Sequence, residues 1–141
     1  MTPPAGYGDD TWVGVDVGTQ SVRAVAVTRA GSVLGAGARA LVSRRDGARH
    51  EQDPEAWWDA VAGATSEALR GVRSESLRGV AVDATSGTVV LTDVRGQALS
   101  PGLMYDDTRA AGYVDRVNEA GQPSIGIPSG TGNGPGSDSS G

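Results

Sequence analysis

Residues 12–28 read WVGVDVGTQSVRAVAVT, and this stretch decides how the rest of the chain is interpreted. It predicts a β-strand that ends near Asp16, then a tight turn, then a second strand. The residues of the turn are Gly18, Thr19, Gln20 and Ser21. Successive backbone N–H groups form a concavity that binds anions, and a nearby carboxylate can hold Mg²⁺ through water. The stretch therefore indicates a turn that can hold a phosphate.

The same stretch also fits an ordinary β-hairpin. In that interpretation Asp16 caps the turn, and Thr19 and Ser21 are solvated turn residues. Arg23 directly follows the turn, where its guanidinium could add positive charge beside a phosphate. A short motif is a hypothesis until its surroundings support it, so the choice depends on the rest of the chain.

The composition narrows the class of protein. The chain has 141 residues, a net charge of −5 and no cysteine, which excludes disulfides and thiolate chemistry. There is no basic stripe or aromatic series, so we expect no nucleic-acid partner. A single histidine, His50, cannot form a metal cluster by itself. No stretch approaches the length of a membrane span and no signal-like segment opens the chain, so we expect a cytoplasmic protein without a membrane partner.

The two ends of the chain differ in composition from its middle. Residues 1–11 are rich in Pro, Gly and Asp, and we expect a flexible leader there. Residues 121–141 are dominated by Gly, Ser and Pro, and cannot offset their ordering entropy by burial. We expect that tail to be disordered, which leaves one ordered domain over residues 12–120.

The middle of the chain alternates strands and helices. A third strand is predicted over residues 33–43, followed by a polar loop over 44–52. Asp53 and Pro54 then mark a helix start, because a carboxylate suits the N-cap and proline suits the first helical position. Apolar residues at helical spacing continue to near Gly71.

Two further strands and a helix are predicted after this first helix. The strands are expected over residues 78–83 and 89–92, with a small polar turn between them. A second helix is expected from about Thr108 to Glu119, with Val114 and Val117 facing inward.

Four blocks of sequence together resemble the N-terminal part of the FGGY family of carbohydrate kinases. They are GVDVGTQSVRA, HEQDPEAWW, VAVDATSGTVVLTD and PGLMYDDTRA. Their joint order and spacing make the resemblance specific from about residue 12 to 120. It implies an α/β fold, a partial actin-like ATPase (ribonuclease H-like) domain. Its expected order is three antiparallel strands, then helix, strand, hairpin and helix, in an incomplete lobe.

The resemblance assigns the opening turn to the nucleotide. It implies that Asp16 acts at the Mg²⁺ ion and the phosphates of ATP, and that Arg23 lies close to them. The residues that would line the phosphates are Gly18, Thr19, Gln20 and Ser21. Phosphoryl transfer depends mainly on positioning and charge neutralisation, and a turn with a metal-holding carboxylate supplies both.

The third and fourth blocks are similar to the family's sugar-binding segments. The residues implied beside the sugar hydroxyls are Asp83, Thr85, Ser86 and Gly87, and the loop DATSGT looks most like the D-ribulose and xylulose kinases. Tyr105 stands where the family usually has Trp, a flat wall beside the substrate, which puts the sugar preference in question. Asp107 and Arg109 keep the family's usual pair.

Several of these residues also have a structural interpretation. Asp107 and Arg109 could cap and pair at the start of the second helix, and Asp83 could form a turn at a strand end.

The second block has mainly structural interpretations. Trp57 and Trp58 fit a core or half-buried flank better than a sugar platform. His50 and Glu51 are expected in a loop, with His50 solvated.

The family's general base comes later than the matching region, so the resemblance assigns no catalytic residue here. We expect a truncated or frameshifted product, or a fragment of a larger reading frame, that is inactive alone. Helices that cover the second face of the sheet would then be missing, and an uncovered apolar patch would favour self-association.

Three functions remain open from the sequence. The first is part of an ATP-dependent kinase that phosphorylates a pentulose, D-ribulose or D-xylulose. The second is a catalytically inactive remnant with weak nucleotide or phosphate binding. The third is a different actin-like ATPase. Such a protein would have no use for residues 83–109, which fit a sugar loop.

Overall fold

The computed structural model describes residues 10–121. Residues 1–9 of the leader expected over 1–11, and residues 122–141 of the tail expected over 121–141, lie outside the described residues. Asp10 and Thr11 are buried, and Thr11 begins β1, so the leader is wrong at these two positions. The chain divides into two compact units after Arg109. None of the helices in the described part combines the length and the apolar character needed to cross a bilayer.

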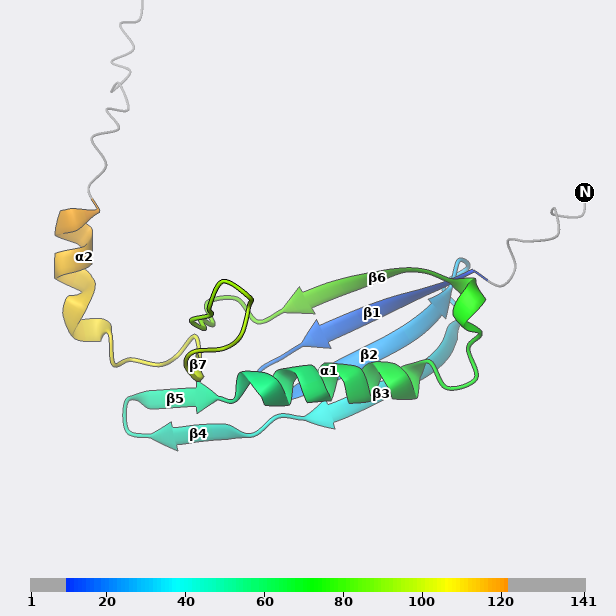
Figure 1. Cartoon of the computed structure of the whole chain (residues 1–141), viewed down its shortest axis with the longest axis horizontal. Helices are drawn as coiled ribbons and strands as arrows, with labels where there is room; N and C mark the ends of the chain where they lie inside the picture. Colours follow the sequence, from blue (N-terminus) through cyan, green and yellow to red (C-terminus); the bar gives the residue numbers. More distant parts are fainter. Residues whose placement is uncertain (1–9, 122–141) are drawn as a thin grey trace, which may run out of the picture. The chain divides into compact units, whose positions relative to one another are not determined.

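A four-stranded sheet forms the first unit's centre (Figure 1). Its strands are β1 (Thr11–Val17), β2 (Ser21–Thr28), β3 (Val33–Ala40) and β6 (Leu77–Ala84), in the spatial order β3-β2-β1-β6. β1, β2 and β3 are antiparallel neighbours, whereas β6 runs parallel to β1. The three antiparallel opening strands are therefore confirmed, with β1 beginning one residue earlier than expected.

Helix α1 (Pro54–Ala68) covers one face of this sheet, as Figure 1 shows. Its start is as predicted: the Asp53 side chain accepts a hydrogen bond of 3.0 Å from the Glu55 N–H. The helix lies so close to β3 that a Cβ atom at Gly35 or Gly37 would collide with helix backbone oxygens. Small residues on both partners thus allow close packing of the helix on the sheet.

The core lies between α1 and the central strands. Its buried residues are Val13, Val15, Val22, Ala24, Ala60, Ala64 and Ala68. The edge strand β6 has less cover, because Val80 is 66% and Val82 is 65% exposed. Within residues 10–109 the structure describes one α-helix, and the face opposite to it carries a shallow hollow of about 780 Å³. This is the uncovered sheet face expected from the sequence.

A second, three-stranded sheet contradicts the polar loop predicted over residues 44–52. It contains β4 (Ser43–Asp46), β5 (Arg49–Gln52) and the short β7 (Gly102–Leu103), in the order β4-β5-β7. Gly47 has a φ of +55° in the turn between β4 and β5. The predicted third strand, 33–43, is therefore two strands, since β3 ends at Ala40 and β4 begins at Ser43.

Two other predictions are wrong in detail. The strand expected at 89–92 is reduced to isolated bridges, one between Val89 and Leu103 and one between Thr92 and Ala98. In the second unit, a 3-10 turn (Ala111–Tyr113) precedes α2 (Val114–Ala120), so the helix begins later than expected.

The second unit's helix also lacks the inward face predicted for it. Val114 is 53% and Val117 is 65% exposed. Another 3-10 turn, Ser74–Ser76, precedes β6 in the first unit.

Candidate functional site

The phosphate turn, residues 18–21, joins β1 to β2. Inside it, the Gly18 N–H donates to the Ser21 carbonyl at 3.1 Å. The Gln20 carbonyl accepts from the Leu41 N–H at 2.8 Å, and the Thr19 carbonyl accepts from Gln52 Nε2 at 2.7 Å. The carbonyl oxygens of Thr19, Gln20 and Ser21 are therefore occupied by the protein.

Three charged side chains lie next to the turn on the uncovered sheet face. Asp16 pairs in register with Arg23 on β2 and with Asp83 on β6. Side chains alternate along a strand, and Val15 points into the core beneath α1, so Asp16 points from the opposite face. All three charged residues line the shallow hollow. The structure thus groups Asp83 with Asp16 and Arg23.

Asp16 is well suited to a metal ion that arrives with a nucleotide. Within residues 10–121 its carboxylate forms no hydrogen bond or ion pair. In the same range no group of three or more metal-ligating side chains could hold an ion by itself. Mg²⁺ is usually held by one or two carboxylates together with waters and substrate phosphates. The Asp16 carboxylate can be such a ligand.

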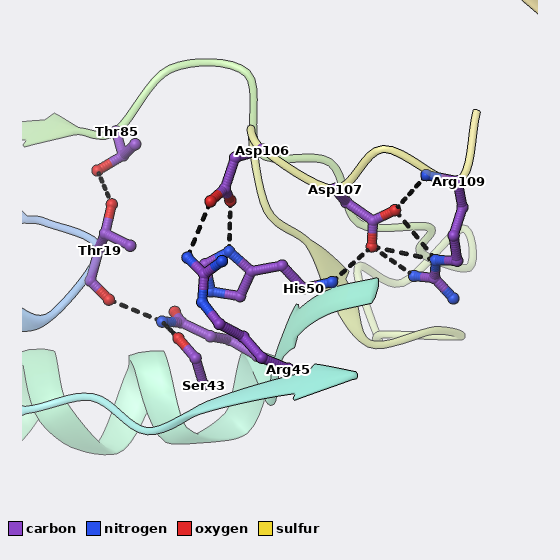
Figure 2. A network of polar contacts seen from close by, with 9 residues as sticks. Thr19, Ser43, Arg45, His50, Thr85, Asp106, Asp107 and Arg109 are labelled. Atoms are coloured by element: carbon purple, nitrogen blue, oxygen red, sulfur yellow. Dashed lines mark hydrogen bonds and ion pairs between the residues drawn. The ribbon is translucent and has the colours of Figure 1, made fainter. Parts of the chain in front are cut away.

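The polar loop, residues 83–88, meets the phosphate turn directly. The Thr85 N–H donates to the Val17 carbonyl at 3.1 Å, and the hydroxyls of Thr85 and Thr19 are 3.4 Å apart (Figure 2). Ser86 is exposed. Gly87 has a φ of +79°, and a Cβ there would lie 3.2 Å from Tyr105 Cβ. The structure therefore brings the loop together with both the turn and Tyr105.

Asp107 and Arg109 are held in an ion-pair cluster. Arg109 Nε lies 3.0 and 3.1 Å from the two Asp107 carboxylate oxygens, and Arg109 Nη2 lies 2.6 Å from Glu51 Oε1. Asp107 also accepts from the His50 backbone N–H at 2.9 Å. The pairing expected from the sequence is present, but α2 begins at Val114, so Asp107 caps a turn and no helix.

Asp106 completes this cluster and was not singled out from the sequence. Its carboxylate contacts His50 Nδ1 and accepts from Arg45 Nη2 at 2.8 Å, as Figure 2 shows. His50 is 1% exposed, so the prediction of a solvated loop histidine is wrong. The buried imidazole is tolerated because Asp106, distant in sequence, folds back to it.

The contacts of the cluster lower the pKa of both aspartates. The hydrogen bonds from His50 and Arg45 lower the pKa of Asp106. The Arg109 guanidinium, and then the His50 backbone N–H, hold the pKa of Asp107 far below its ordinary value. Asp107 in return raises the pKa of Arg109. The segment 105–109 is therefore attached to β5 mainly by charged groups.

Gln52 was also missed, although it lies within the HEQDPEAWW block. It is 3% exposed and bonds the phosphate turn, β4 and α1 at once. Trp57 has the half-buried structural position expected for it, with its indole N–H donating to Gln52 and its ring against Gly102. Trp58 is 69% exposed, so the core or half-buried position expected for it is wrong.

Comparison with known proteins identifies similar sequences. The N-terminal domain of the FGGY family of carbohydrate kinases matches residues 11–134. A xylulose kinase from Streptomyces coelicolor is 34% identical over 105 residues, covering 74% of this chain and 21% of that enzyme. A xylulose kinase from Streptomyces rubiginosus is 34% identical over 107 residues, covering 76% and 22%. The chain thus spans about a fifth of the length of these relatives.

Solved structures show the same fold. A xylulose kinase from Rhodospirillum rubrum superimposes with a TM-score of 0.70 at 26% identity, over 78% of this chain and 23% of that one. A glycerol kinase from Plasmodium falciparum with ADP gives a TM-score of 0.66 at 15% identity, over 78% and 23%, which compares the fold alone. The actin-like ATPase fold expected from the sequence is confirmed.

Proposed function

Because this chain belongs to the FGGY family of carbohydrate kinases and matches its N-terminal domain, we propose that it supplies phosphate and sugar contacts of a pentulose kinase. The reaction transfers the γ-phosphoryl group of ATP to a hydroxyl of D-ribulose or D-xylulose. Relatives that are named xylulose kinases support the pentulose class of substrate.

The contact between the phosphate turn and the polar loop carries this proposal. Thr85 bonds the end of β1 through its backbone, and its hydroxyl lies 3.4 Å from the hydroxyl of Thr19. A phosphoryl acceptor held by the loop would therefore lie next to phosphates held by the turn. Proximity of this kind supplies much of the catalysis in phosphoryl transfer.

We assign Asp16 to the Mg²⁺ ion and Arg23 to the charge of the phosphates. Bound Mg²⁺ would neutralise negative charge on the transferring phosphoryl group. The turn residues assigned to the phosphates are Gly18, Thr19, Gln20 and Ser21. Their backbone N–H groups and hydroxyls suit phosphate oxygens, which accept hydrogen bonds.

The polar loop and segment 105–109 are assigned to the sugar. The loop residues are Asp83, Thr85, Ser86 and Gly87, whose short polar groups can both donate and accept hydrogen bonds. Tyr105 lies against Gly87 and is 58% exposed, so its ring is free to form one wall of the sugar site. Asp107 and Arg109 hold this segment on β5.

A second candidate function is nucleotide or phosphate binding without turnover. It is favoured by the extent of the match, because the chain spans about a fifth of its relatives' length. None of the carboxylates in residues 10–121 is assigned to the general base that the attacking hydroxyl requires. We therefore expect the 141-residue chain alone to bind Mg·ATP weakly and to turn over slowly or not at all.

A coupled phosphotransfer assay with ATP, Mg²⁺ and a panel of pentuloses and polyols tests the proposal, beside a direct titration with Mg·ATP. Asp16→Asn should weaken nucleotide binding, whereas Asp59→Asn, on the exposed side of α1, should leave it unchanged. Phosphorylation of a pentulose supports the first function, and binding alone supports the second. A chain that binds no nucleotide, or whose affinity is unchanged by Asp16→Asn, contradicts both.

A further inference from the structure

We propose that Gln52 is a positioning residue that fixes the orientation of the peptide between Thr19 and Gln20. It lies at the end of β5, outside the turn and outside the residues assigned to ligands above. The proposal rests on the proposed function only in naming phosphate as the ligand. The orientation of the peptide is a property of the chain itself.

The side chain of Gln52 is almost fully buried and almost fully bonded. At 3% exposure, its Nε2 donates to the Thr19 carbonyl at 2.7 Å and to Ser43 Oγ at 2.8 Å. Its Oε1 accepts from Trp57 Nε1 at 2.6 Å. A glutamine amide has two donor hydrogens, and both are used by these contacts.

The chemistry of the partners fixes which way the amide faces. An indole N–H only donates, so it must meet the oxygen of Gln52. A backbone carbonyl only accepts, so the Thr19 oxygen must meet the nitrogen. A flipped amide would place two donors together at Trp57 and two acceptors together at Thr19. Gln52 therefore holds the Thr19 carbonyl in one direction.

This direction determines where the next amide points. The described residues contain no cis peptide bond, and in a trans peptide the N–H points opposite to the C=O. With the Thr19 carbonyl directed at buried Gln52, the Gln20 N–H is directed away from the protein interior. No hydrogen bond occupies this N–H within the described residues. It is free to donate to a phosphate oxygen.

Other contacts do not replace this one. The Leu41 N–H holds the next carbonyl, that of Gln20, and the contact to Thr85 uses the Thr19 side chain. Neither fixes the peptide plane between Thr19 and Gln20. Without Gln52, the Thr19 carbonyl has no buried donor and the peptide can rotate, which would remove the outward N–H.

The same strand also holds the sugar side of the proposed site. His50 and Glu51 bind the segment that contains Asp107 and Arg109. Residues 50–52 therefore attach both ligand-binding parts to β5, which explains why this short strand carries buried polar side chains.

Gln52→Glu is the test variant. Glutamate has nearly the same size and can still accept from Trp57, but its carboxylate cannot donate to the Thr19 carbonyl. Two variants serve as controls. Ser43→Ala removes the other acceptor of Nε2 and leaves the Thr19 contact. Ala60→Gly weakens α1 in the core and leaves the turn untouched.

Two readouts on the 141-residue chain separate positioning from folding. The first is the ¹⁵N order parameter of Gln20, expected near 0.85 in the unmodified chain and below about 0.6 in Gln52→Glu. The second is affinity for Mg·ATP, expected to fall about tenfold in Gln52→Glu, as for one lost buried hydrogen bond. Both controls should retain the order parameter and the affinity.

The outcomes are distinguishable. If the unmodified chain binds no Mg·ATP, the proposed function fails, and the order parameter alone decides the role of Gln52. An order parameter at Gln20 that Gln52→Glu does not change overturns the inference. If Gln52→Glu does not fold, the role of Gln52 is tested on the unmodified chain by measuring hydrogen exchange and NOEs of the Gln52 side-chain amide. Slow exchange and NOEs to Thr19 support the role, and fast exchange with solvent overturns it.

Discussion

The phosphate turn and segment 105–109 are both attached to β5, but by different forces. The turn is held by neutral hydrogen bonds from a buried amide, Gln52. The segment is held mainly by charged side chains: Arg109 pairs with Glu51, and the carboxylates of Asp107 and Asp106 accept from the His50 backbone N–H and from Arg45. Neutral buried contacts respond weakly to pH and salt, whereas ion pairs near solvent respond to both.

This difference suggests which half of the site is fixed and which can adjust. A phosphate turn needs its N–H groups held in one geometry before the ligand arrives. Segment 105–109, beside the proposed sugar site, can move as long as it returns to the same position when the sugar binds. The two attachments should therefore fail under different conditions, and the following predictions separate them in order of decreasing effect.

The largest effect is expected from Gln52→Leu. This change leaves the Trp57 indole N–H and the Thr19 carbonyl without their buried partners, and each unsatisfied group is costly. We expect the free energy of unfolding to fall by about 2 to 4 kcal/mol, measured by urea denaturation. Trp58→Leu, at a 69% exposed position, is the control and should change it by less than about 0.5 kcal/mol. If Gln52→Leu lowers the free energy of unfolding no more than Trp58→Leu does, the buried amide of Gln52 does not hold the turn.

Acid should release the segment before it affects the turn. The folded pKa values of Asp106 and Asp107 are lowered, so their contribution to stability is complete well above the unfolded value of about 3.9 and is lost as pH falls below it. Unfolding curves recorded from pH 6 down to about pH 1.5 measure this loss. The double variant Asp106→Asn, Asp107→Asn should have a flatter acid limb. An unchanged acid limb would show that the cluster does not cause the loss.

Asp107→Asn should have a smaller and local effect. Asparagine can still accept from the His50 backbone N–H, but the charge opposite Arg109 is lost. Amide exchange over residues 102–109 should become faster, while exchange in the phosphate turn stays the same. Asp115→Asn, in the second unit, is the matched control for loss of one charge. Equal acceleration in the turn would mean that the two attachments are not independent.

The smallest effect is expected from Arg45→Gln. The Arg45 side chain is 61% exposed, and Asp106 keeps its contact with His50 when Arg45 is replaced. Exposed ion pairs contribute little to stability, so we expect no measurable change in the urea midpoint. A clear destabilisation would place Arg45 among the residues that hold the segment.

The parts of the fold that could be predicted are those marked by patterns among neighbouring residues in the sequence. Alternation in residues 12–28 and the Asp53–Pro54 helix start are read from neighbouring residues, and both were found. The β4–β5 hairpin was missed because residues 44–52 look polar. Its buried side chains contact residues far away in sequence, His50 at Asp106 and Gln52 at Thr19. The Asp46–Gly47 dipeptide, a common hairpin turn, was the available signal.

The candidate site divides in the same way. The turn residues and Asp16 were proposed from the sequence because glycine, hydroxyls and a carboxylate stand together in it. Asp106 and Gln52 were not, because their importance depends on tertiary contacts with β5 and with Thr19. The second helix was placed too early because its observed N-cap, Tyr113, forms no side-chain capping bond and so does not mark the start in the sequence.

An amide chemical-shift map of the 141-residue chain titrated with Mg·ATP shows whether the phosphate turn binds the nucleotide. The largest shifts are expected on the phosphate turn and on residues 83–87, with Gln20 among them, and Asp16→Asn should raise the Mg·ATP concentration needed to produce them. Shifts confined to α1, or the absence of any saturable shift in the turn, would contradict nucleotide binding by the turn.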